Sequence, residues 1–137
     1  MASNKYIKAF ELTPLQEGML LHSLEGSSGT YVEQLMYTFH GELDLVFFEK
    51  ALTYLVDQHE VLRTIVLHDK LSSPKQVVLE KPLGINFAHK DISDLSVKSQ
   101  NSHINDYLSN DRSRSFDVSR EPLFRVQLFQ LQKKQVI

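Results

Sequence analysis

Cysteine is absent from this 137-residue chain, which excludes disulfide bonds, thiolate nucleophiles and metal sites with cysteine ligands. An excess of charge of one sign is lacking too, because 15 basic residues stand against 17 acidic ones, for a net charge of −2. That balance argues against a nucleic-acid surface. No stretch has the apolar core of a signal peptide or the length needed to span a bilayer. We therefore expect a soluble, cytoplasmic protein without membrane or nucleic-acid partners.

Signatures of catalytic sites are scarce as well. The six histidines include no pair at the three- or four-residue spacing of a helical metal site, so we expect no bound metal. Neither a Gly-x-Ser-x-Gly elbow nor a glycine-rich phosphate loop occurs. The residues by themselves predict no complete catalytic centre.

The longest regular pattern lies in the stretch Asp44–Leu67. Five of its residues are spaced alternately by four and three positions, which places them on one stripe of an α-helix. The stripe consists of Phe48, Leu52, Leu55, His59 and Leu62. Asp44 stands where an N-cap belongs. The β-branched run Thr64–Val66 favours a strand. We predict a helix that continues to about Arg63 and leads directly into a buried strand.

Polar residues stand at that junction, namely His59, Glu60 and Arg63. For His59 we favour a buried imidazole bonded to backbone over a ligand or catalytic group, because it has no partner at ligand spacing. Two interpretations of Arg63 stay open. Its guanidinium either lies near the negative end of the helix dipole or reaches a buried carboxylate, a task that its planar donors suit better than a lysine would.

The N-terminal part predicts an edge strand and a helix. Lys5–Phe10 alternates apolar and polar residues and is interpreted as the strand. A helix then begins with Thr13 as N-cap, Pro14 at the first helical position and Gln16 completing a capping box, and it runs to Leu24. Its apolar face consists of Leu15, Met19, Leu20 and Leu24. Met19 either fills the core, which we favour at this spacing, or lines a ligand cavity.

The rest of the chain alternates between strands and one further helix. Strands are predicted at Tyr31–His40, Thr64–His68, Lys75–Glu80, Ile85–His89, Leu123–Leu131 and Gln135–Ile137. The second and third of these form a hairpin. A polar helix is expected over Leu95–Arg112, covering one face of a sheet with an inner stripe of Val97, Ile104 and Leu108.

No repeat or linker divides the sequence. The segment Arg112–Arg120 combines arginines with serines, and we favour a solvated turn over a phosphate site because it offers neither a helix N-terminus nor a glycine-rich nest. We expect residues 1–137 to form one structural unit of the α/β class. Its predicted architecture is a two-layer α+β sandwich, in which helices cover a mixed sheet.

Three segments resemble successive motifs of one family. Leu12–Leu24 (LTPLQEGMLLHSL) resembles the first core motif of the condensation domains of nonribosomal peptide synthetases, and Thr13, Gln16 and Met19 belong to it. Gln58–Val66 (QHEVLRTIV) resembles the second, usually written RHExLRTxF. This sequence departs from the pattern at both ends of that segment, whereas the centre matches at His59, Glu60, Arg63 and Thr64. Phe116–Val126 resembles the stretch that precedes the third motif.

The resemblance implies a fold similar to chloramphenicol acetyltransferase, in which two α/β halves enclose a tunnel. It identifies this chain as the N-terminal subdomain. In this family, which serves antibiotic biosynthesis and other secondary metabolism, peptidyl carrier protein domains bring a donor and an acceptor as phosphopantetheine thioesters. The acceptor amine attacks the donor thioester, and a peptide bond forms. The implied partners are carrier protein domains and the C-terminal half of the condensation domain. The resemblance implies that this chain binds no cofactor directly.

The catalytic motif of the family, HHxxxDG, is not among the 137 residues, and the resemblance places it beyond Ile137. We therefore expect no catalytic residue in this chain, no condensation by the chain alone, and self-association through surface that the other half covers. The resemblance pairs the aspartate of that motif with Arg63. Two alternatives stay open: a non-catalytic docking module, and part of a CoA-dependent acyltransferase of the same fold.

Overall fold

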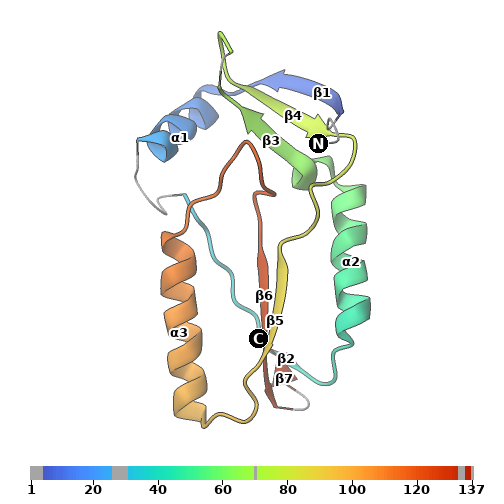
Figure 1. Cartoon of the computed structure of the whole chain (residues 1–137), viewed down its shortest axis with the longest axis vertical. Helices are drawn as coiled ribbons and strands as arrows, with labels where there is room; N and C mark the ends of the chain where they lie inside the picture. Colours follow the sequence, from blue (N-terminus) through green and yellow to red (C-terminus); the bar gives the residue numbers. More distant parts are fainter. Residues whose placement is uncertain (1–4, 26–30, 70, 133–134, 137) are drawn as a thin grey trace.

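The computed structural model describes residues 5–25, 31–69, 71–132 and 135–136 (Figure 1). Its helices are α1 (Pro14–Leu24), α2 (Leu45–Gln58), the short 3-10 helix η1 (Glu60–Arg63) and α3 (Val97–Ser113). Its strands are β1 (Tyr6–Glu11), β2 (Phe39–His40), β3 (Thr64–Leu67), β4 (Lys75–Leu79), β5 (Phe87–Asp91), β6 (Val126–Gln132) and β7 (Gln135–Val136). The predicted last strand is confirmed at β7, while its final residue Ile137 lies outside the described residues.

The strands form two sheets. One is antiparallel in the order β1-β4-β3, with the predicted hairpin β3–β4 and with β1 as the predicted edge strand. The other has the order β2-β7-β6-β5 and is mixed, because β5 and β6 run parallel while the remaining pairs are antiparallel. The predicted mixed sheet with covering helices is confirmed, and the three-stranded sheet is added to it.

Helix α1 begins as predicted. Thr13 Oγ1 accepts a hydrogen bond from Gln16 N–H at 3.3 Å, and Gln16 Oε1 accepts one from Thr13 N–H at 2.8 Å. Both bonds of the capping box are present, with Pro14 at the first turn. The predicted apolar face is buried only in part, because Leu20 is buried while Leu15 and Leu24 are 74% and 55% exposed.

Helix α2 ends five residues earlier than predicted, at Gln58. Its N-cap is Asp44, whose carboxylate accepts from Phe47 N–H at 3.0 Å. His59 adopts an extended backbone (φ −112°, ψ 106°) and is exposed, so the interpretation of a buried imidazole on the apolar stripe is wrong. The stripe stops because the chain leaves the α-helix there and turns through η1 into β3, leaving Val56 as the buried residue of this helix.

The predicted strand Tyr31–His40 forms only at its end, as β2. Residues 31–38 are not in a strand, because the described residues of β7 pair on this side only with Phe39 and His40. The alternation of the sequence does not supply a neighbouring backbone, and a strand needs one for its hydrogen bonds.

Helix α3 covers the four-stranded sheet as predicted. Ile104 is buried against Phe129 and Leu131 of β6. Val97, expected on the inner stripe, is 68% exposed. Gln100 takes its place, because its side chain donates to Ile92 O at 2.9 Å and to Leu131 O at 3.0 Å. Two satisfied hydrogen bonds make a buried amide acceptable at that position.

The four-stranded sheet is covered on both faces. Figure 1 shows α3 on one side of β5 and β6 and α2 on the other. The consecutive residues Leu128 and Phe129 point to opposite faces of β6, and each is only 4% exposed. A second cluster holds the three-stranded sheet together through Ile65, Val77 and Leu79. None of the described helices is long and apolar enough to cross a membrane.

Candidate functional site

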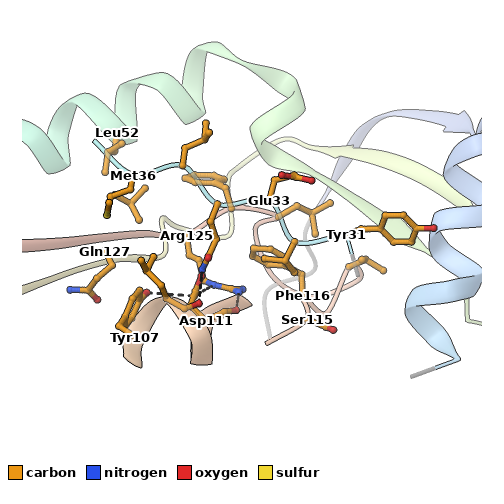
Figure 2. Close-up of a pocket in the computed structure, with 18 of the residues that line it drawn as sticks. Tyr31, Glu33, Met36, Leu52, Tyr107, Asp111, Ser115, Phe116, Arg125 and Gln127 are labelled. Carbon is orange, nitrogen blue, oxygen red and sulfur yellow. Dashed lines mark hydrogen bonds and ion pairs between the residues drawn. The ribbon is translucent and has the colours of Figure 1, made fainter. Parts of the chain in front are cut away.

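The structure contains a cavity of about 730 Å³ (Figure 2). Its walls come from α1, the extended segment 31–38, α2, α3, the 115–118 stretch and the residues at the start of β6. Most wall residues are apolar, such as Met19, Leu20, Leu52, Leu108, Phe124 and Leu128. The cavity therefore favours an apolar occupant.

One buried ion pair stands in this apolar wall. Arg125 Nε contacts Asp111 Oδ1, and the two side chains are 7% and 12% exposed. Arg125 Nη2 also donates to the carbonyls of Asp111 and Arg114, each at 2.7 Å. The guanidinium lies over the Phe116 ring, 4.2 Å from its centroid. These contacts place the cation at the C-terminal end of α3, where the helix dipole favours it.

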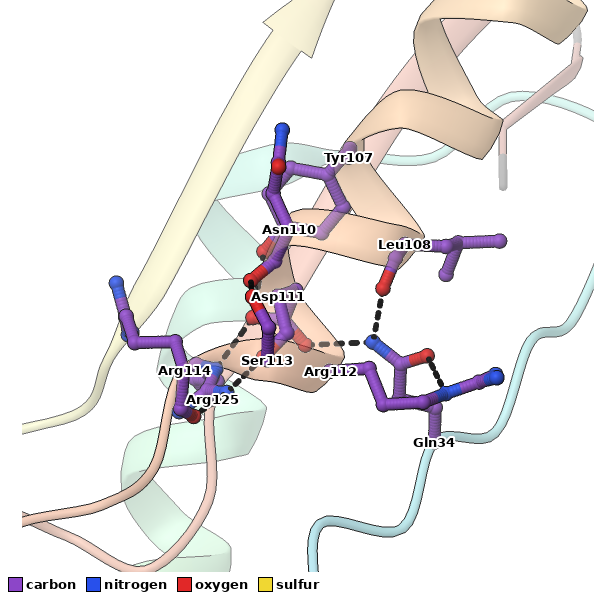
Figure 3. Close-up of polar contacts among 9 residues, drawn as sticks. All are labelled: Gln34, Tyr107, Leu108, Asn110, Asp111, Arg112, Ser113, Arg114 and Arg125. Carbon is purple, nitrogen blue, oxygen red and sulfur yellow. Dashed lines mark hydrogen bonds and ion pairs between the residues drawn. The ribbon is translucent and has the colours of Figure 1, made fainter. Parts of the chain in front are cut away.

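Gln34 links the extended segment to the same helix end (Figure 3). Its Nε2 donates to Leu108 O at 3.1 Å and to Asp111 Oδ2 at 2.8 Å, and its Oε1 accepts from Arg112 Nε at 3.1 Å. Each side-chain oxygen of Asp111 thus has a donor. The segment 31–38, which has no strand partner among the described residues, is held to α3 through this amide.

The pKa of Asp111 is lowered. Burial alone would raise the pKa of this carboxyl, but hydrogen bonds from Arg125 and Gln34, together with the positive charge of Arg125, outweigh it. The pKa of Tyr107 is raised, first by burial and then by the neighbouring charge of Asp111. At neutral pH the Asp111 carboxyl is therefore ionised and the Tyr107 hydroxyl stays protonated.

One donor of this cluster has no partner among the described residues. Arg125 Nη1 is buried and makes no hydrogen bond. An unsatisfied buried donor costs about 1–3 kcal/mol. The wall of the cavity therefore contains an unused hydrogen-bond donor.

Arg63 lies outside the cavity walls and contacts backbone. Its Nε donates to Leu79 O at 3.0 Å, and its Nη1 donates to Asp57 O at 2.6 Å and Val56 O at 3.3 Å. The last two carbonyls belong to the final turn of α2, so the interpretation as a cation at the helix C-terminus is confirmed. Its pairing with the aspartate of HHxxxDG stays a prediction.

The other residues of the second motif also make local contacts. Glu60 accepts two hydrogen bonds from Lys8 Nζ, at 2.7 and 2.8 Å, and this contact lowers the pKa of Glu60. Thr64 Oγ1 donates to Glu60 O at 2.8 Å. His59 stays exposed beside them. The motif thus joins α2 to β1 and β4, and its last residue, Val66, lines the cavity.

The structure brings the first motif and the stretch before the third motif together. Gln16 and Met19 line the same cavity as Phe116 and Arg125. Met19 is half-buried, and it lines the cavity, the interpretation that the sequence disfavoured. Thr13 caps α1 from outside these walls.

Sequence reasoning missed the ion pair of Arg125 with Asp111 and the amide of Gln34. One signal was available, because Arg125 interrupts an otherwise apolar strand, and an arginine in such a place requires an acceptor. Its partner lies 14 residues away on α3, which periodicity does not reveal. The Arg112–Arg120 segment is solvated only in part: Arg120 is exposed and lies 3.8 Å from Asp117, whereas Phe116 and Val118 line the cavity. Within the described part of the chain, no cluster of acidic and histidine residues is arranged to hold a metal.

Comparison with known proteins identifies the family. A family model of the condensation domain matches residues 6–137. The chain is similar to surfactin synthase subunit 2 of Bacillus subtilis (strain 168), with 36% identity over 99% of this chain and 4% of that protein. It is also similar to gramicidin S synthase 2 of Brevibacillus brevis, with 37% identity over 90% of this chain and 3% of that protein.

Solved structures agree on the fold. The first condensation domain of the calcium-dependent antibiotic synthetase has a TM-score of 0.76 and 20% identity, over 94% of this chain and 31% of that chain. The starter condensation domain of rhizomide synthetase has a TM-score of 0.76 and 17% identity, over 94% of this chain and 32% of that chain. The chain thus spans about a third of the length of these structures.

Fold and cavity together define an α/β unit of the chloramphenicol acetyltransferase-like class, as the sequence predicted. The chain belongs to the condensation-domain family of nonribosomal peptide synthetases.

Proposed function

We propose that residues 1–137 are one structural unit, the N-terminal subdomain of a condensation domain that joins aminoacyl or peptidyl thioesters through an amide bond. The observation that carries the proposal is the family match over residues 6–137, combined with curated relatives that are peptide synthetases. The chain spans 4% and 3% of the length of those two relatives. The activity of the whole enzyme is therefore part of this proposal.

The described contacts support structural roles for the motif residues. Thr13 and Gln16 start α1, Met19 lines the cavity, and Arg63 joins α2 to β4. His59, Glu60 and Thr64 belong to the same junction. We propose that these residues stabilise the elements that form the wall of the substrate channel. The HHxxxDG motif positions or deprotonates the reacting amine.

Carrier protein domains are the proposed partners, because condensation domains operate among them in peptide synthetases. A four-domain nonribosomal peptide synthetase matches this chain with a TM-score of 0.74 over 99% of the chain. In the proposed reaction the substrates arrive on phosphopantetheine arms, and this chain binds no cofactor directly. The channel requires both halves, because holding two reactants in register contributes about 7–11 kcal/mol.

A chimaera tests the proposal. The segment of surfactin synthase subunit 2 that aligns with this chain is replaced by residues 1–137, and amide formation from carrier-bound aminoacyl thioesters is followed by mass spectrometry. We expect turnover by the chimaera and none by the 137-residue chain alone. A chimaera with alanine at both histidines of HHxxxDG is the control for background. A folded chimaera without turnover, or turnover by the isolated chain, would contradict the proposal.

A further inference from the structure

Helix α2 is apolar on two opposite faces. Its inner face consists of Phe48, Leu52 and Val56, which recur every four residues and are buried or half-buried. On its outer face Phe47 is 68% exposed and Tyr54 is 64% exposed. Figure 1 shows α2 at the edge of the molecule, with the four-stranded sheet on one side of it. A surface helix ordinarily turns polar residues outward, so large apolar side chains on the outer face indicate an interaction surface.

The outer residues form a continuous seam. Phe47, Ala51, Tyr54 and Gln58 follow one another at steps of four, three and four residues, and all four are exposed. Two helices that pack along each other use this spacing for the residues between them. Ala51 lies in the middle of the seam, and its small side chain allows a second helix to approach closely. The seam therefore fits one further helix.

The charges beside this seam indicate which helix it fits. Lys50 and Asp57 lie seven residues apart on the same flank of the seam. Lys50 Nζ lies 5.4 Å from the centre of the Phe47 ring, and neither Lys50 nor Asp57 forms an ion pair with another described residue. The flank thus offers a cation and an anion, about two helical turns apart.

A second copy of α2 matches both charges. When two helices pack antiparallel about a twofold axis, the same flank of each helix faces the other. Lys50 of one copy then faces Asp57 of the second copy, and the symmetry forms this pair twice. Packed in parallel, the flank would instead face the opposite flank of the second copy, where Phe48 and Leu55 carry no charge. Charge complementarity therefore selects the antiparallel pair.

We propose that the outer face of α2 binds a second copy of this chain, with the two α2 helices antiparallel. In the register that brings Lys50 to Asp57, the Tyr54 ring of each copy lies over Ala51 of the other copy. Because the contact is the same on both copies, it closes as a dimer. The seam belongs to a helix of 14 residues, so the interface is small and the dimer is reversible. The inference depends neither on the proposed enzymatic activity nor on the cavity.

Charge reversal in the 137-residue chain tests this interface by sedimentation velocity. Lys50→Glu makes the flank doubly negative, and Asp57→Lys makes it doubly positive. Each variant alone therefore repels its own copy, and we expect its dimer dissociation constant to be at least about tenfold higher than that of the unchanged chain. An equimolar mixture of the two variants pairs opposite charges again and should form a heterodimer as tight as the original dimer. The double variant should also dimerise like the unchanged chain.

Lys98→Glu and Asp106→Lys are the matched controls, because they make the same charge changes at exposed positions of α3 and should leave the dissociation constant unchanged. Positions 50 and 57 lie outside both the cavity walls and β1, so association through those surfaces would not respond to these charges. Circular dichroism reports that each variant is folded. The proposal is overturned if the unchanged chain stays monomeric up to its solubility limit, if the single variants associate as it does, or if their mixture stays monomeric where it dimerises.

Discussion

A buried arginine requires compensation of its charge close by. Arg125 finds it in Asp111, in two carbonyls and in the Phe116 ring. Removing one member of a buried pair leaves an uncompensated charge, which is more costly than the pair is stabilising.

For Asp111→Ala we expect the free energy of unfolding to fall by about 3–5 kcal/mol, because Arg125 then stays charged and buried without its carboxylate. Urea unfolding followed by circular dichroism measures the change. Asp106→Ala, an exposed position on the same helix, is the matched control and should change stability by about 0.5 kcal/mol or less. Equal losses in the two variants would show that the pair does not stabilise the fold.

The pH dependence of stability follows from the lowered pKa of Asp111. A carboxyl whose pKa is lower in the folded than in the unfolded state contributes stability above its unfolded pKa, about 3.9. That contribution is lost as the pH falls through the folded pKa. We expect the stability difference between the chain and Asp111→Asn to be full at pH 7 and to shrink progressively below about pH 4. Urea midpoints from pH 7 to pH 3 measure it, and a constant difference would contradict the assignment.

Arg63 bonds three carbonyls within this chain. Arg63 therefore stabilises the 137-residue chain even without the aspartate of HHxxxDG. For Arg63→Ala we expect the free energy of unfolding of the 137-residue chain to fall by about 1–3 kcal/mol, since two part-buried carbonyls and one exposed carbonyl lose their donor. In a complete condensation domain the predicted pairing with a buried aspartate increases the loss to about 3–5 kcal/mol. Urea unfolding of both proteins tests the pairing, which equal losses would reject.

At the scale of elements, the ends of helices follow local chemistry. Thr13, Gln16 and Asp44 have the capping contacts that the sequence predicts, because the partners lie within three residues. Boundaries that depend on distant partners were predicted less well. Val97 is exposed, whereas Gln100 is buried and donates to the carbonyls of Ile92 and Leu131. Residues 31–38 have no paired neighbour among the described residues.

Capping of α1 gives the prediction at this scale. Thr13→Ala removes the acceptor for Gln16 N–H and should cost about 0.5–2 kcal/mol, with a lower melting temperature in calorimetry. Thr53→Ala is the matched control inside α2, where Thr53 Oγ1 only donates to Glu49 O. Alanine favours a helix interior, so this control should be neutral or slightly stabilising. A Thr13→Ala variant as stable as the control would indicate that the cap contributes nothing.

At the scale of the molecule, the chain exposes apolar surface around its cavity and along β1. Leu35 is 81% exposed, Tyr37 63% and Phe10 51%. Exposed apolar patches and open sheet edges lead to association. We therefore expect dimers or larger assemblies in solution, with a mass by light scattering that rises with concentration. A single monomer mass at high protein concentration would be evidence against this expectation.

The sequence by itself determined the order of helices and strands, the N-caps, the hairpin β3–β4 and the family, because these depend on neighbours within a few residues or on contiguous motifs. Only the tertiary structure decided that Arg125 bonds Asp111, that His59 is exposed where α2 ends, and that Gln34 holds residues 31–38 to α3. Each of these depends on a partner from another part of the fold. Hydrogen bonds and charges are satisfied by whatever lies close in space, and periodicity along the chain carries no record of that partner.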